Sequence, residues 1–334
     1  SNILEGLNDK QYEAVVTTEG PCLVIAGAGS GKTKVLTHKI AYLIGEKGVK
    51  PWDIIAITFT NKAANEMKER ITKLVGDPAK DIWMGTFHSI CVRILRRFID
   101  RIGFDSSFII FDTSDQKSLV KNCLKDLGID DKLFTDKSVM SEISNAKNEM
   151  LEPAQYKARA SGDFRKEKIA NVYELYQKRL KENNAIDFDD IINYTIKILM
   201  ENPDILEYYA NKFKYVLVDE YQDTNKAQFT LVTLFASKNG NITVVGDNDQ
   251  GIYSFRGADI SNILNFERDF PGTKIIKLEQ NYRCTQNILK VANSVIKNNE
   301  VKYKKELWTQ NEEGSLPKVY QAENEYDEAS YVAD

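Results

Sequence analysis

The sequence has no long apolar run and no targeting segment at its start. No stretch approaches the roughly 18 consecutive apolar residues that would suggest a transmembrane helix. The opening residues, SNILEGLNDK, contain neither the basic region nor the apolar region of a signal peptide. We therefore expect a cytoplasmic protein without a membrane partner.

The sequence is also poor in cysteine. Its four cysteines, Cys22, Cys91, Cys123 and Cys284, are far apart and form no CxxC pair. This spacing argues against a zinc site and against a disulfide framework. We interpret the four side chains as reduced thiols that lie mostly in the core.

A strong excess of basic residues, which is typical of nucleic-acid-binding domains, is absent as well. The formal net charge is −4, but it is unevenly distributed, since residues 1–186 carry +4 and residues 187–334 carry −8. One basic cluster either contacts phosphates or forms a solvated helix face, and it consists of Arg93, Arg96, Arg97 and Arg101. Charge alone therefore decides nothing about the partner.

Short β-branched segments alternate with helical patterns early in the chain and again after about residue 215. CLVIAG and IIAITFT are each followed by an amphipathic pattern, and YVLVDE, NITVVGD and KIIKLEQ each lead into a loop or helix. This alternation predicts an α/β fold with a parallel sheet that has helices on both faces. Between about 111 and 186, apolar residues recur three and four apart, which predicts an inserted helical subdomain.

A phosphate-binding loop is indicated at residues 26–33, AGAGSGKT, between an apolar strand and a helix. Backbone N–H groups of such a loop and the positive end of the helix dipole hold a polyphosphate. Lys32 is expected to reach the β and γ phosphates, and the Thr33 hydroxyl to hold Mg²⁺. The residues predicted to contact the nucleotide here are Ala28, Gly29, Ser30, Gly31, Lys32, Thr33 and Lys34.

A second motif, YVLVDEYQD at 215–223, is an apolar strand that ends in adjacent carboxylates. Ligands of parallel sheets bind at the carboxyl ends of the strands. Asp219 is therefore placed to coordinate Mg²⁺, and Glu220 to orient or deprotonate the attacking water. An isolated Asp-Glu pair is more often a solvated turn, but the strand and the phosphate-binding loop favour a catalytic role.

The motifs together resemble those of superfamily 1 DNA helicases of the UvrD/PcrA/Rep type. The resemblance rests on the two motifs above, VVGDNDQGIYSFRGAD at 244–259, LEQNYRCTQNIL at 278–289, and the shorter segments LNDKQYEAV, FTNKAANEM and GTFHS. It implies RecA-like motor domains, each interrupted by a helical insertion. Residues 1–110 and 187–288 would form motor domain 1A, residues 111–186 its insertion 1B, and residues 289–334 the connection to a second motor domain, 2A.

The resemblance also implies roles for residues around the nucleotide. Gln11 would hydrogen-bond the adenine edge, and Tyr282 would stack on its face. Gln250 would sense the γ phosphate, and Arg283 would stabilise the charge that develops on it.

On the DNA side, the family pattern implies a single-strand track. Phe59, Tyr253 and Phe255 would stack on bases, and the residues that would contact the backbone or bases are Asn61, Thr86, His88 and Arg256. The third motif departs from the commonest family form at Gly251, Ser254 and Phe255, where Ser, Arg and Trp are usual. We therefore expect weaker DNA binding than the family norm and unchanged ATP chemistry.

The implied activity is an ATP-dependent, 3′-to-5′ DNA helicase and translocase that uses ATP and Mg²⁺. Its implied partners are single-stranded DNA, junctions of single- and double-stranded DNA, and repair or replication proteins. An amphipathic pattern is cut short at Asp334, so we expect the second motor domain to follow it. We expect this fragment alone to bind nucleotide weakly and not to unwind DNA.

Three alternative functions remain open at this point. The chain could be the motor half of an AddA/RecB-type helicase-nuclease, although the compact insertion favours the simpler helicase. It could be an ATP-switched DNA-binding module without turnover, against which the intact Asp219–Glu220 pair argues. A small-metabolite kinase or transport ATPase would explain the phosphate-binding loop but not Gln11 or the third motif.

Overall fold

The computed structural model describes residues 2–27, 29–247, 261–298 and 305–333. Five of the candidate site residues lie outside the described residues, namely Ala28, Gln250, Tyr253, Phe255 and Arg256. Gly251 and Ser254, where the third motif departs from the family form, lie outside them too.

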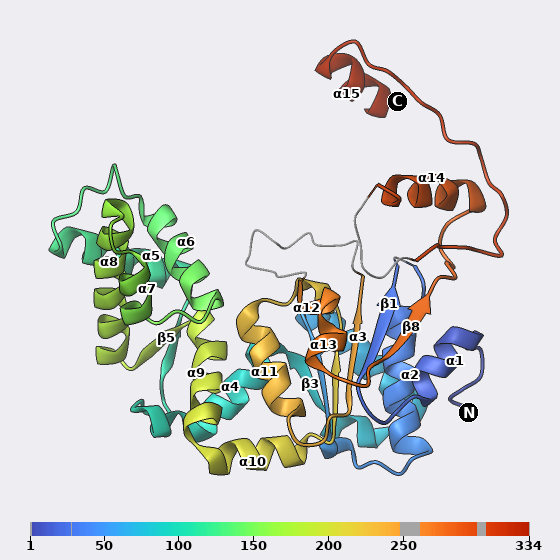
Figure 1. The fold of residues 1–334 in the computed structure, drawn as a ribbon, viewed down its shortest axis with the longest axis horizontal. Coiled ribbons are helices and arrows are strands. Elements are labelled where there is room, and N and C mark those ends of the chain that lie inside the picture. The colour runs from blue at the N-terminus through green and yellow to red at the C-terminus, as the bar shows by residue number, and fades with distance from the viewer. Residues whose placement is uncertain (1, 28, 248–260, 299–304, 334) are drawn as a thin grey trace.

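Six parallel strands form the central sheet, in the order β3-β2-β6-β7-β1-β8 (Figure 1). The strands are β1 (Cys22–Ala26), β2 (Ile54–Thr58), β3 (Trp83–Thr86), β6 (Tyr215–Val218), β7 (Ile242–Gly246) and β8 (Lys274–Leu278). Because all six run in one direction, their carboxyl ends meet at one edge. The phosphate-binding loop after β1 and Asp219 after β6 therefore lie at the same edge of the sheet.

Both faces of the sheet are covered by helices, as the sequence predicts. Successive strand residues point to opposite faces, so Leu23 and Ile25 of β1 join one core, and Cys22, Val24 and Ala26 join the other. The second of these cores is completed by α1 (Asp9–Val16), α2 (Lys32–Gly45) and α3 (Asn61–Val75). The first is completed by α4 (Phe87–Phe98), α9 (Phe188–Glu201), α10 (Pro203–Lys212), α11 (Lys226–Ala236), α12 (Ser261–Leu264) and α13 (Phe266–Asp269).

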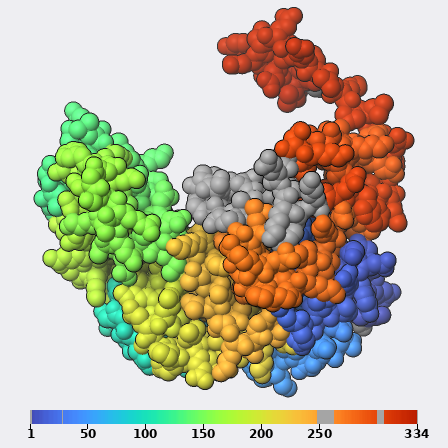
Figure 2. Space-filling model, viewed as in Figure 1, coloured from blue at the N-terminus to red at the C-terminus, as the bar shows by residue number. Residues whose placement is uncertain are grey.

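Four helices form a lobe with its own hydrophobic core, beside the sheet domain (Figures 1 and 2). They are α5 (Thr113–Asp126), α6 (Asp136–Asn148), α7 (Pro153–Arg159) and α8 (Phe164–Glu182). Where the chain enters and leaves the lobe, β4 (Ile109–Phe111) pairs in parallel with β5 (Ala185–Asp187). The sequence does not predict this short pair, because three residues are too few for a period-2 pattern. The domain boundaries proposed above stay predictions.

A buried ionic cluster connects α6 of the lobe to the start of α9. Lys147 Nζ lies 2.6 Å from Asp187 Oδ2 and 2.9 Å from Asp190 Oδ1, and the Tyr176 hydroxyl donates to Asp187 at 2.9 Å. Burial, with the Asp187 charge, raises the pKa of Asp190 to about 7. Burial acts to raise the pKa of Asp187 too, but Lys147 holds it below its usual value. The cluster therefore depends on the Lys147 cation.

The C-terminal elements lie above the sheet domain in Figure 1. They are α14 (Gln286–Ile296) and α15 (Glu325–Ala333), and α15 has no buried residue. Trp308, between these helices, continues the sheet edge by bridging to Gln280 next to β8. Within the described ranges, none of the helices has the length and apolar character needed to cross a membrane.

Candidate nucleotide site and nucleic-acid groove

The loop between β1 and α2 requires glycine at two positions. Gly29 and Gly31 have φ values of 71° and 79°, a region that residues with a Cβ rarely adopt. A Cβ on Gly31 would also lie 2.4 Å from Gln11 Nε2, and one on Gly29 would lie 2.9 Å from the Arg283 Cβ. The loop is thus tightly enclosed, and α2 begins directly after it at Lys32 with its amino end at the edge of the sheet. This geometry suits a polyphosphate.

The loop lysine forms an ion pair with the second acidic motif. Lys32 Nζ donates to Glu220 Oε1, and Gln222 Nε2 donates to the other oxygen, Oε2, at 2.6 Å. The Glu220 backbone has a φ of 50°, a left-handed conformation that is uncommon for a residue with a side chain and is typical of functional sites. Phosphate oxygens would therefore compete with Glu220 for Lys32.

Two further carboxylates beside Glu220 could hold a cation. Burial, with the Glu220 charge, raises the pKa values of Asp219 and Asp223 to about 6. The buried Asp223 Oδ1 has no hydrogen-bond partner among the described residues. Those residues contain no group of three or more metal-binding His, Cys, Asp or Glu side chains. Asp219 and Asp223 are oxygen donors of the kind that bind Mg²⁺, which takes one or two carboxylates and completes its shell with water and phosphate oxygens.

The predicted base-binding residues border a cavity of about 500 Å³. Its lining consists of Gly6, Gln11, Gly29, Gly31, Lys34, Tyr282 and Arg283. Tyr282 is half exposed, which leaves its ring available for stacking. Its backbone N–H donates to Gly29 O at 3.0 Å, and its hydroxyl accepts from Asn8 Nδ2 at 2.6 Å. The fold thus brings residues from both ends of the chain to the loop.

Gln11 is held in place by local hydrogen bonds. Its Oε1 accepts from the Asn8 backbone N–H at 3.0 Å, and the Asn8 side chain caps α1 in return. Gln11 Nε2 lies 3.5 Å from Ser30 O of the loop. Asn8 was not among the predicted site residues, although an Asn three residues before a Gln is a capping-box pattern that could have indicated it.

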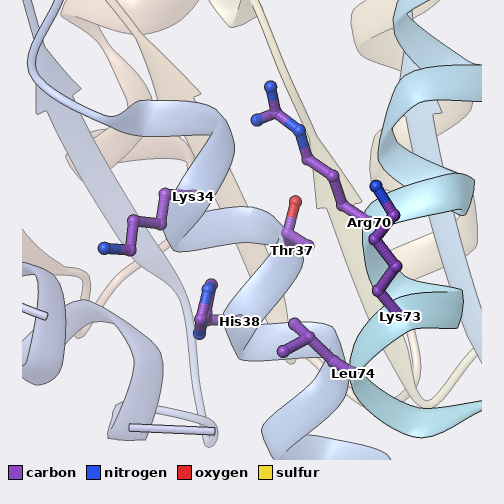
Figure 3. A pocket seen from close by; sticks show the side chains of 6 residues that line it. All are labelled: Lys34, Thr37, His38, Arg70, Lys73 and Leu74. Atoms are coloured by element: carbon purple, nitrogen blue, oxygen red, sulfur yellow. The ribbon is translucent and has the colours of Figure 1, made fainter. Parts of the chain in front are cut away.

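A second cavity, of about 310 Å³, lies between α2 and α3 (Figure 3). Lys34, Thr37 and His38 come from α2, and the remaining lining residues from α3 are Arg70, Lys73 and Leu74. Lys34 borders both cavities, so this basic cavity adjoins the base-binding side of the nucleotide site.

A groove of about 480 Å³ runs between the sheet domain and the helical lobe. Three predicted DNA contacts line it, namely Phe59, Thr86 and His88, whereas Asn61 is exposed at the start of α3 and is not part of the lining. The lobe contributes small polar side chains, which are Ser141, Ser144, Asn145 and Asn148. The groove thus combines aromatic rings, on which the bases of a single strand can stack, with hydrogen-bonding groups and the carboxylates of Asp189 and Asp223.

Phe188, at the start of α9, is a groove residue that the sequence reasoning missed. Its ring stacks on His88 at a centroid distance of 3.6 Å and an interplanar angle of 15°, yet the residue is 53% exposed. Burial lowers the pKa of His88 to about 4. The signal available in the sequence was an aromatic residue between acidic ones in IDFDD, where a buried position is not expected.

His88 should therefore remain neutral at physiological pH. We expect its ring protons to titrate near pH 4 in an NMR titration, well below the ordinary 6.5. The pKa of His88 is lower in the folded state than in the unfolded state. The contribution of His88 to the free energy of unfolding should therefore be fully present above about pH 6.5, and it should be lost as the pH drops toward 4. The chain has only two histidines, so a His88→Asn variant assigns the signal. Titration of His88 near pH 6.5 would contradict this environment.

Two family models together match most of the chain. The model of the UvrD/REP helicase N-terminal domain matches residues 7–271, and that of the UvrD-like helicase C-terminal domain matches residues 276–334. The chain is 54% identical over 333 residues to the ATP-dependent DNA helicase PcrA of Bacillus subtilis, covering 100% of this chain and 45% of that protein. It is 57% identical over 330 residues to PcrA of Staphylococcus aureus, covering 99% and 45% respectively. The chain thus spans about half the length of the curated relatives it matches.

Proposed function

Because the chain belongs to the UvrD/REP helicase family, we propose that it binds and hydrolyses ATP and that hydrolysis drives movement along single-stranded DNA. The observation that carries the proposal is the convergence of Lys32, Asp219 and Glu220 at one edge of the sheet, beside a cavity lined by Gln11 and Tyr282. A metabolite kinase would not need the aromatic groove between the sheet domain and the lobe.

In the proposed reaction, Lys32 exchanges its bond to Glu220 for the β and γ phosphates. The freed Glu220 carboxylate, still held by Gln222, then orients the attacking water and accepts its proton. Thr33 and Asp219 would hold Mg²⁺, which neutralises charge on the phosphates when it is bound. Arg283, at the cavity wall, would stabilise the charge that develops on the γ phosphate.

For the nucleic acid, we propose that a single strand lies in the groove between the sheet domain and the lobe. Phe59 and Phe188 would stack on bases, and Thr86 would bind the backbone. His88 would contribute a neutral ring. Tyr253, Phe255 and Arg256, together with the γ-phosphate sensor Gln250, stay predictions from the family pattern, as does Asn61.

The proposed translocation would need a second motor domain. We propose that a second motor domain of the same protein closes over the nucleotide and adds its own arginine. The 3′-to-5′ direction, the action on single- to double-strand junctions, the repair or replication partners and the cytoplasmic location are part of this proposal.

A turnover assay with the full-length protein tests the function. ATP hydrolysis should rise strongly when single-stranded DNA is added, and a Lys32→Ala variant should lose it while retaining the fold. Phe188→Ala should weaken single-strand binding by about 1–3 kcal/mol, the usual contribution of one stacked base. ATP binding without any turnover would favour the ATP-switched module instead, and turnover indifferent to DNA would leave a P-loop ATPase without a helicase role.

A further inference from the structure

A buried ion pair outside the predicted site residues lies next to the phosphate-binding loop. Lys305 Nζ is 2.5 Å from Asp247 Oδ1, and each side chain is only 5% exposed. Asp247 directly follows β7, at the same edge of the sheet as the loop, whereas Lys305 lies in the segment after α14. The pair therefore joins that segment to the edge of the sheet that carries the candidate nucleotide site.

The segment that carries Lys305 packs directly on the phosphate-binding loop. A Cβ on Gly27, the second residue of the loop, would lie 2.7 Å from Leu307 Cδ2 and 3.2 Å from Lys305 Cε. Asn293 of α14 binds both the backbone N–H and the backbone carbonyl of Leu307, at 3.2 and 2.9 Å. Trp308 N donates to Glu279 O at 2.8 Å beside the end of β8. The backbone at Leu307 and Trp308, just after Lys305, is thus held to α14 and to the end of β8.

A continuous series of polar contacts runs from this ion pair to Glu220. The Asp247 backbone N–H donates to Gln222 Oε1 at 3.1 Å, and Gln222 Nε2 donates to Glu220 Oε2 at 2.6 Å. A Cβ on the neighbouring Gly246 would lie 2.7 Å from Gln222 Oε1, so the amide of Gln222 has little room to move. The position of Asp247 therefore affects the orientation of the Glu220 carboxylate.

We infer that Lys305 is a positioning residue for ATP hydrolysis, which holds Asp247 so that Gln222 can orient Glu220. The inference rests on the function proposed above. The charge on Lys305 matters because Asp219, Glu220 and Asp223 already crowd this edge of the sheet. Without the Lys305 cation, the Asp247 carboxylate would lose a close opposite charge, while this acidic group and the phosphates of the nucleotide would still repel it. Its backbone would then shift, and the orientation of Gln222 would be lost.

The test compares Lys305→Met, Lys305→Arg and the double variant Lys305→Met/Asp247→Asn in the full-length protein. The exposed Lys290→Met, on α14, is the matched control. We expect Lys305→Met to lower kcat roughly 10- to 100-fold, the usual effect of removing a supporting partner of a metal site, while the Kd for Mg·ADP changes by less than about threefold. Lys305→Arg should retain most of the activity. The double variant should recover most of kcat, because the asparagine that replaces Asp247 keeps the backbone bond to Gln222 without the buried charge.

Circular dichroism and the thermal midpoint of each variant separate positioning from folding. An unchanged kcat in Lys305→Met, a loss that follows only the folded fraction, or a double variant as slow as the single one would each overturn the inference. A wild-type protein that does not hydrolyse ATP would instead refute the proposed function. An active wild type with an unaffected Lys305→Met variant would refute only the role of Lys305.

Discussion

Replacing Glu220 by Gln should lower kcat for ATP hydrolysis by roughly 10²- to 10⁴-fold, the contribution of a positioned general base. Gln has nearly the same shape and can still accept a hydrogen bond from Gln222, but it cannot accept the proton of the attacking water. ATP should bind at least as tightly as in the wild type, because the variant removes the carboxylate that pairs with Lys32. Turnover with single-stranded DNA and the Kd for Mg·ATP measure the two effects.

The matched control is Glu207→Gln on α10. Glu207 is exposed, and its ion pair with Lys238, at 3.5 Å, lies at the surface. Exposed pairs contribute little, so this variant should retain wild-type turnover and stability. A Glu220→Gln protein with near-normal turnover would remove Glu220 from the centre of the reaction.

Replacing Lys147 by Met should lower the free energy of unfolding by about 3–5 kcal/mol, the usual cost of leaving buried charges without their partner. The side chains of Lys147, Asp187 and Asp190 are almost completely buried. The cost should be larger at pH 8 than at pH 6. The pKa of Asp190 is about 7 with Lys147 present, which lowers it. Without Lys147 this pKa rises, so protonation of Asp190 at the lower pH removes one of the unpaired buried charges. Urea unfolding at the two pH values measures the difference.

Hydrogen exchange locates the effect of Lys147→Met in the chain. We expect faster exchange in α6 and at the start of α9, since the cluster joins these two helices. Adding Asp187→Asn and Asp190→Asn should recover much of the lost stability, because neither ion-pair partner of Lys147 then carries a charge. Lys197→Met, which removes a partly exposed pair with Glu152 at 3.8 Å, should cost less than about 1 kcal/mol. Equal losses in Lys147→Met and Lys197→Met would show that the buried cluster has no special role.

Lys147 also matters for the groove. Ser144, Asn145 and Asn148 on α6 line one wall, and Asp189 and Asn193 on α9 line the facing region. The ionic cluster lies between these two helices and fixes their spacing. Binding of a single-stranded nucleic acid in the groove would therefore depend on the ionic cluster, even without a contact between the nucleic acid and the cluster.

The sequence predicted the central sheet because its strands are short apolar runs followed by helical patterns. The spacing of apolar residues within one strand or helix is a local property of the sequence, so it can be recognised without knowing which strands pair with each other. The phosphate-binding loop and Asp219–Glu220 were equally recognisable, since the chemistry of each depends on residues adjacent in the chain. The His88–Phe188 stack was not recognisable, because the two residues are a hundred positions apart and neither has a neighbour that indicates the contact.

The sequence by itself determined the α/β fold, the loop that suits a polyphosphate, and the acidic strand end, because local spacing and strand polarity suffice for each. Only the tertiary structure decided that Lys32 pairs with Glu220, that Asn8 contacts Tyr282, and that Lys305 reaches Asp247. These contacts join segments that are distant in the chain. Parallel strands bring their carboxyl ends to one edge of the sheet, and the segments that follow the strands meet there. Buried polar and charged groups at this edge need partners. No local sequence pattern indicates which distant residue supplies the partner.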